Sequence, residues 1–214
     1  ADPATITGSI SFGGDAPAAQ ALQLGADPFC VTANAGQEVL AERVTVNDNG
    51  TLRYVFVYVK EGLEGQTFTT PAGAVELAQT GCMYTPHVIG VQTNQVVTII
   101  NNDDTLHNVN AQPAINRGFN FAQPVKGQRS DQTFSEAELM VPLKCDVHPW
   151  MQAYIGVVAH PYFAVTGEDG SFTISQLPAG DYVVAAWHES LGEQTQNITV
   201  GPNETAEVSF EFGS

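Results

Sequence analysis

Basic residues are scarce in this chain of 214 residues, which has 7 Lys and Arg against 23 Asp and Glu and a formal charge of -16. This balance argues against nucleic acid as a partner, because binding to phosphate needs a basic surface. Long apolar runs are also lacking: no stretch approaches the roughly 20 consecutive apolar residues of a membrane span, so we expect none. The N-terminal residues Ala-Asp-Pro-Ala are not those of a signal peptide, and we expect a mature or trimmed soluble chain.

Sustained helical periodicity is missing as well. Short runs of β-branched and aromatic residues alternate with Gly, Pro, Asn and Asp, and 20 Gly and 12 Pro predict many turns. The composition is therefore typical of an all-β protein. Both faces of the run Leu52 to Lys60 are apolar, which predicts a strand buried on both sides. A single helical turn is expected at 72–79, with Pro71 at its first position. The other strand candidates are 5–12, 43–46, 96–101, 139–145, 153–159, 172–175, 182–187, 196–200 and 206–212.

The composition changes after His160-Pro161. The pattern that follows is an Asp-Gly turn, an apolar strand and then Leu177-Pro-Ala-Gly-Asp-Tyr182, which resembles the small sandwich modules called carboxypeptidase-regulatory-like or transthyretin-like. The stretch 6–12 looks like the opening strand of the same module. We therefore expect residues 1–75 and 161–214 to form one β-sandwich around an inserted domain of residues 76–160. The alternative is a fully sequential arrangement of the domains.

A cysteine, a histidine and a methionine come together in the segment Cys145-Asp-Val-His148-Pro-Trp-Met151. A thiolate, an imidazole and a thioether are ligands that suit copper as it alternates between Cu(I) and Cu(II). A second imidazole, His107, follows the strand candidate that ends at Asn101. Taken singly, each of these side chains has an ordinary structural interpretation, such as a core thiol or a packing methionine. Their joint spacing predicts a copper site.

The region from about residue 80 to 160 resembles the cupredoxin family. Its ligand loop is similar to the short loop of the amicyanin group, and the run that begins His107-Asn108 is similar to the family's pattern at the first His ligand. The resemblance implies an all-β fold, in which a cupredoxin Greek-key β-sandwich (76–160) is joined to a second small β-sandwich. It also implies that one type 1 copper ion is bound by four ligands, His107, Cys145, His148 and Met151.

The resemblance also assigns roles to three neighbours of the ligands. Asn108 would connect the two ligand loops through hydrogen bonds near the Cys sulfur. In this family the ligand that corresponds to His148 lies at the surface, so we expect its exposed edge, with Pro149 and Trp150 around it, to be the electron port. Trp150 has a second interpretation, as a packing residue that fixes the loop.

Two cysteines remain if Cys145 is a copper ligand. In an oxidising compartment Cys30 and Cys82 would form a disulfide, and the alternative is a pair of buried thiols in a cytosolic protein. Copper together with a disulfide favours the periplasm or the extracellular space.

The number and placement of the histidines exclude other classes of copper protein. Multicopper oxidases need many further imidazoles, often as His-x-His pairs, whereas this chain has 5 His and no such pair. A binuclear mixed-valence centre needs two Cys in the ligand loop, and Cys145 stands alone there. A second copper of the nitrite-reductase kind would need the three scattered residues His87, His160 and His188. We interpret these three as structural.

The sequence therefore predicts a blue copper protein that carries single electrons and is not an enzyme. Its partner would be a redox protein such as a c-type cytochrome or a dehydrogenase. Residues 80–160 carry six acids and four bases (-2), whereas the flanks carry -6 and -8, so we expect a near-neutral docking face with acidic surroundings that steer a basic partner. The alternative function is a copper chaperone, or a structural or adhesion module that binds copper without electron transfer.

Overall fold

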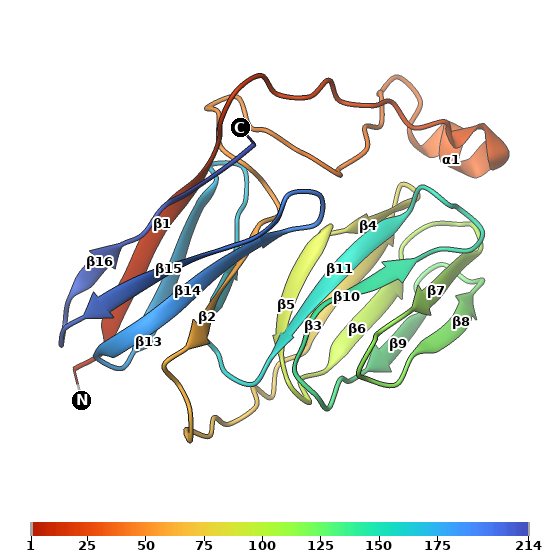
Figure 1. Ribbon diagram of the computed structural model, residues 1–214. Coiled ribbons are helices and arrows are strands. Elements are labelled where there is room, and N and C mark those ends of the chain that lie inside the picture. Colours follow the sequence, from red (N-terminus) through yellow and green to blue (C-terminus); the bar gives the residue numbers. More distant parts are fainter. Residues whose placement is uncertain (1, 214) are drawn as a thin grey trace. The chain divides into compact units, whose positions relative to one another are not determined.

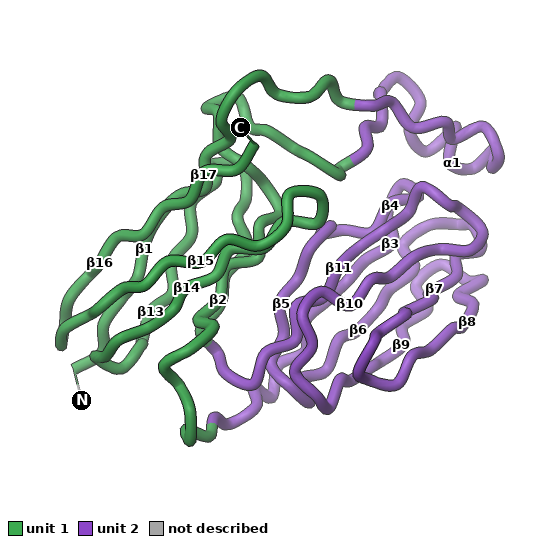
Figure 2. Tube along the Cα trace, viewed as in Figure 1, with its two compact units in different colours: residues 1–19, 42–67, 162–214 green, residues 20–41, 68–161 purple. Residues whose placement is uncertain are grey.

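The computed structural model describes residues 2–213, and the chain forms two compact units that are described one at a time. Unit 1 consists of residues 1–19, 42–67 and 162–214, and unit 2 of residues 20–41 and 68–161 (Figures 1 and 2). In unit 1 the strands are β1 (Ala4–Phe12), β2 (Phe56–Glu61), β12 (Phe163–Val165), β13 (Ser171–Leu177), β14 (Gly180–His188), β15 (Gly192–Val200), β16 (Thr205–Glu207) and β17 (Phe210–Phe212).

Two four-stranded sheets make up unit 1. One has the order β13-β1-β16, with β17 also paired to β1, and the other has the order β12-β2-β14-β15. Strand β2 is central, and Phe56, Val57, Tyr58 and Val59 are all buried, so the prediction of a strand covered on both faces is confirmed.

Unit 2 is also a β-sandwich, and it carries the helices found among the described residues. Its elements are η1 (Leu24–Ala26, a 3-10 helix), α1 (Pro28–Ala33), β3 (Val75–Thr80), β4 (Met83–Thr85), β5 (Val88–Gln92), β6 (Val97–Asn101), β7 (His107–Ala111), β8 (Phe119–Gln123), β9 (Arg129–Gln132), β10 (Glu138–Lys144) and β11 (Gln152–Val158). The sheet orders are β5-β11-β10-β7-β8 and β4-β3-β6-β9. The predicted all-β fold with two sandwiches is confirmed. Within residues 2–213, no helix has the length and apolar character needed to cross a membrane.

The expected helical turn at 72–79 is wrong, because this segment contributes strand β3. Val75, Leu77 and Gln79 alternate towards the interior, and β3 pairs in parallel with β6 from Val75↔Val97 to Gln79↔Asn101. The two-residue period that buries Leu77 and Gln79 decides the local structure, and a helix would turn one of them outwards.

Residues 20–41 lie in unit 2, whereas the expected boundary assigned them to the sandwich of residues 1–75. The two ends of this segment lie next to each other, since Ala21 and Leu40 form an isolated bridge and Ala41 donates its N–H to the carbonyl of Gln20. A disulfide between Cys30 on α1 and Cys82 ties it to the turn before β4. This covalent link, which no hydrophobic pattern signals, explains the difference.

Candidate metal centre

Adjacent strands of one sheet carry the predicted ligands to the same end of unit 2. Strand β7 begins at His107, and the loop 145–151 connects β10 to β11. β10 pairs with both β7 and β11. His107, Cys145, His148 and Met151 are all buried, with 0–1% of their surface exposed.

Three donor atoms converge at this end. Nδ1 of His107 lies 3.0 Å from Nδ1 of His148, and Sγ of Cys145 lies 3.8 Å from the same Nδ1 of His148. Potential ligand atoms of the three residues all lie within 4.8 Å of one another. Met151 belongs to the same buried core cluster as Cys145.

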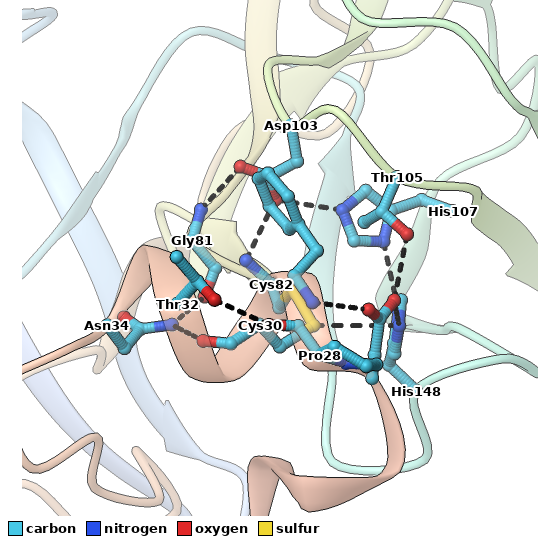
Figure 3. The surroundings of a disulfide bond; sticks show 12 residues. Pro28, Cys30, Thr32, Asn34, Gly81, Cys82, Asp103, Thr105, His107 and His148 are labelled. Carbon is cyan, nitrogen blue, oxygen red and sulfur yellow. Dashed lines mark hydrogen bonds and ion pairs between the residues drawn. A yellow bond between two sulfur atoms is a disulfide. The ribbon is translucent and has the colours of Figure 1, made fainter.

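A carboxylate holds the outer nitrogen of each imidazole. Nε2 of His107 is 2.8 Å from Oδ2 of Asp103, and Nε2 of His148 is 3.0 Å from Oδ2 of Asp27 (Figure 3). Asp103 also accepts hydrogen bonds from the amides of Gly81 and Cys82, both at 2.8 Å. Such carboxylate–histidine pairs fix the tautomer in which the opposite nitrogen is free to bind a metal.

The sulfur of Cys145 accepts two long hydrogen bonds from the backbone, from the N–H of Asn108 and the N–H of His148, both at 3.4 Å. Burial of the thiol opposes ionisation, but hydrogen bonding with His107 and these amides outweighs it and lowers the pKa of Cys145. The thiolate that a metal requires is thereby favoured.

The pKa values of the two histidines are shifted in opposite directions. Burial alone would lower the pKa of His107, but hydrogen bonds with Asp103 and Cys145 reverse this effect and raise it. Burial lowers the pKa of His148, and the neighbouring His107 adds to this, against the opposing hydrogen bond with Asp27.

The donor set fits a single copper ion. A carboxylate lies beside Nε2 of each ring, so the two Nδ1 atoms face each other at 3.0 Å and are both available to a cation. With metal–N and metal–S lengths of about 2.0 and 2.3 Å, as zinc proteins show them, angles of about 100–120° separate two nitrogens by about 3.1–3.5 Å and a nitrogen from a sulfur by about 3.3–3.7 Å. The observed 3.0 and 3.8 Å lie within about 0.1 Å of these ranges, so the spacing of the three atoms is close to that of donors around one ion. Two imidazoles with one thiolate and a thioether nearby suit copper.

Backbone hydrogen bonds close the ligand loop. The N–H of Met151 donates to the carbonyl of His148 at 2.9 Å, and the N–H of Cys145 donates to the carbonyl of Met151 at 3.2 Å. Tyr84, which the sequence did not single out, is fully buried, and its hydroxyl donates to the carbonyl of Asn108 at 2.8 Å. The loop and the start of β7 are therefore held by the core.

The residues expected beside the ligands have distinct positions. The side-chain oxygen of Asn108 accepts the N–H of Asp146 at 3.1 Å, so this residue joins the two ligand segments. Trp150 is half-buried, its ring centre lies 5.2 Å from that of His148, and its indole N–H donates to the carbonyl of Cys82 at 3.0 Å. Pro149 is exposed.

The expectation of an exposed edge on His148 is wrong, because only 1% of its surface is accessible. Residues of the segment 20–41 cover this edge: Asp27 bonds to Nε2, and Sγ of Cys30 lies 3.6 Å from the same nitrogen (Figure 3). The sequence signals the helix that carries these residues, since Asp27-Pro28 fits an N-cap followed by proline at the first helical position, but it does not signal their contact with His148.

The other histidines stand apart from this cluster. His87 is buried, with Nδ1 3.1 Å from the carbonyl of Gln152, and His188 is buried on β14 of unit 1. The ring of His160 lies edge-on to Phe68. Among the described residues, none of these three histidines belongs to a cluster of potential metal ligands.

Comparisons with known proteins find both resemblances that the sequence suggested. Residues 149–213 match the family model of the carboxypeptidase regulatory-like domain. No curated protein sequence matches the chain.

Among solved structures, a novel purple cupredoxin from Nitrosopumilus maritimus is 22% identical, with a TM-score of 0.34 over 39% of this chain and 98% of that chain. A variant of amicyanin with Cu(I) is 22% identical, with a TM-score of 0.36 over 47% of this chain and 97% of that chain. A copper-containing nitrite reductase from Thermus scotoductus is 18% identical, with a TM-score of 0.34 over 45% of this chain and 24% of that chain.

Proposed function

We propose that this protein is a type 1 blue copper protein that carries single electrons between redox proteins and is not an enzyme. The observation that carries the proposal is the buried group of His107 Nδ1, Cys145 Sγ and His148 Nδ1, in which a carboxylate orients each imidazole. Met151 would be the weak axial ligand. Unit 2 would be the copper domain, and unit 1 the carboxypeptidase-regulatory-like domain.

Bound copper would supply a one-electron couple between Cu(I) and Cu(II). The chain's contribution is to hold the same donors in place for both oxidation states, so that little rearrangement accompanies the transfer. His107 is fixed by Asp103, His148 by Asp27, and the sulfur of Cys145 by two amides. Burial of all four ligands keeps water from the site.

This burial favours a resident ion over a transported one. A chaperone passes copper on by exchanging ligands with its partner, and ligands with 0–1% exposure offer the partner no access without local opening. A copper ion with only a structural role is the remaining alternative, and reversible reduction of the bound ion without loss of the fold distinguishes the two.

The proposed location is the periplasm or the extracellular space, and the partner a redox protein such as a c-type cytochrome or a dehydrogenase. The disulfide between Cys30 and Cys82 supports the location, since such bonds persist in oxidising compartments.

The proposal is tested by loading the metal-free protein with Cu(II) and recording its visible spectrum. We expect an intense thiolate-to-copper charge-transfer band that disappears on reduction and is absent from Cys145→Ser. Met151→Leu should keep the band but shift its position and the reduction potential. The matched control is Met83→Leu, a methionine on β4 outside the ligand loop, which should leave both unchanged. A colourless Cu(II) complex of the unmodified protein would contradict the proposal.

A further inference from the structure

Asp27 is attached to two different parts of unit 2 through its two carboxylate oxygens. Oδ1 accepts the N–H of Phe29 at 2.8 Å, which caps the short helix α1. Oδ2 lies 2.8 Å from the hydroxyl of Thr105, which donates to it, and 3.0 Å from Nε2 of His148. One oxygen therefore serves the helix and the other serves the metal centre.

The second oxygen connects both ligand segments. Thr105 stands in the turn that leads into β7 and the ligand His107, whereas His148 is on the loop between β10 and β11. A hydroxyl and an imidazole N–H directed at one oxygen leave the ring of His148 a single favourable orientation, with Nδ1 facing His107 and Cys145.

The carboxylate is itself held rigidly. The disulfide from Cys30 to Cys82 anchors α1, and the side-chain amide of Asn34 donates to the carbonyls of Cys30 at 2.8 Å and Gly81 at 2.9 Å (Figure 3). Asp27, at the N-cap of this anchored turn, needs no rearrangement to meet His148. Such preorganisation is what allows an outer residue to influence a ligand strongly.

We infer that Asp27 is a positioning residue for the copper ligand His148, supplied by a segment outside the two sheets. It accepts the Nε2 proton, directs Nδ1 inwards and takes the place of solvent at the outer edge of the ring. Its negative charge favours the more highly charged Cu(II) over Cu(I). This inference rests on the proposed function as far as copper is concerned, whereas the hydrogen bond itself does not.

Asp27→Asn separates the two roles of the residue. Asparagine is as good an N-cap as aspartate, so α1 keeps its cap, but an amide NH₂ cannot accept the proton of His148. The matched control is Asp104→Asn, which removes the same charge from an exposed side chain next to Thr105. A difference between the two variants therefore reports the hydrogen bond and not the overall charge.

We expect Asp27→Asn to lower the ratio of Cu(II) to Cu(I) affinity about tenfold, which corresponds to a rise of about 59 mV in the one-electron reduction potential. Asp104→Asn should change the ratio less than about threefold, well below the effect of losing an outer-shell partner. Equal effects of the two variants in a protein with the blue band would overturn the inference. If Asp27→Asn does not fold, Asp27→Ser, which also caps a helix but is too short to reach His148, is judged by the same criterion.

A second measurement tests the hydrogen bond without electron transfer. In the Zn(II)-loaded protein, nitrogen NMR should show a slowly exchanging Nε2–H on His148 that is lost in Asp27→Asn and kept in Asp104→Asn. Absence of this signal from the unmodified protein would overturn the inference even if the copper form is blue. A colourless copper form with this signal present would instead refute the proposed function alone.

Discussion

Removal of the disulfide should cost unit 2 several kcal/mol of stability. Cys30 and Cys82 are separated by 52 residues, and in the chain-entropy model the closure of such a loop in the unfolded chain contributes about 4 kcal/mol at 25 °C. Both residues are fully buried, so the substitution of alanine for each also leaves small cavities worth about 1 kcal/mol together. We therefore expect Cys30→Ala/Cys82→Ala to lower the free energy of unfolding of metal-free protein by about 5 kcal/mol.

Urea unfolding followed by hydrogen exchange and mass spectrometry measures this loss and assigns it to a unit. The loss should fall on unit 2, because both cysteines belong to it. Reduction of the unmodified metal-free protein isolates the loop contribution of about 4 kcal/mol, since it leaves no cavity. The control is the double variant treated with the same reductant, which should not change further.

Two results would refute this reasoning. A loss below about 1 kcal/mol would mean that the unfolded chain is not constrained by the bond, because residual structure already keeps the two segments together. A loss confined to unit 1 would mean that the segment 20–41 does not fold with the strands of unit 2.

Two further predictions concern acid stability and the thiol count. The carboxylate of Glu138 is buried, but hydrogen bonds from Asn116 and from the backbone of Ala114 and Ile115 outweigh that burial and lower its pKa. The ionised carboxylate therefore stabilises the fold at any pH above the ordinary pKa of glutamate. This contribution is lost as the pH falls through the lowered pKa. Glu138→Gln should therefore lower the free energy of unfolding by about 2 kcal/mol at pH 7 and by progressively less in acid, which urea titrations at several pH values would measure. The control Glu136→Gln, at an exposed position, should behave as the unmodified protein. A loss for Glu138→Gln that does not change with pH would contradict this reasoning. Thiol titration of denatured, metal-free protein should find one free thiol, that of Cys145, and a count of three would disprove the disulfide.

The group of candidate ligands was predictable from the sequence because its pattern is local. Cys145, His148 and Met151 lie within one segment of seven residues, and few functions other than soft-metal binding place these three side chains in one loop. The candidate ligand on β7 was also identifiable, since a strand candidate precedes His107. What the structure adds is the pair of carboxylates that orient the two rings.

Strand β3 shows where local preference misleads. Its sequence from Ala72 onwards contains residues that favour a helix, such as Ala and Leu, and Pro71 resembles a helix start. Pairing with β6 outweighs these preferences, and the side-chain amide of buried Gln79 donates to Gln123 of β8 inside unit 2. Neither the partner strand nor Gln123 can be identified from the eight residues of the predicted turn alone.

The role of Asp27 was beyond sequence reasoning for a different reason. The Asp-Pro pair signals a helix start, and Asp27 does cap α1 through one oxygen. Its other oxygen meets a histidine 121 positions later, and only the folded chain brings these two together. One residue can satisfy a local rule completely and still carry a second role.

In the proposed electron carrier, the covering of His148 also changes where a redox partner would approach. An exposed ligand edge would allow direct contact, but here Asp27 and the disulfide occupy that position. Trp150 is half-exposed, and its ring lies 5.2 Å from that of His148, so it offers an aromatic route from this candidate ligand to the surface. In such a carrier the cover would lengthen the path for the electron, and in return it would keep the imidazole fixed and dry in both oxidation states. The low cost of rearrangement and the longer path would thus have a common origin in the segment 20–41.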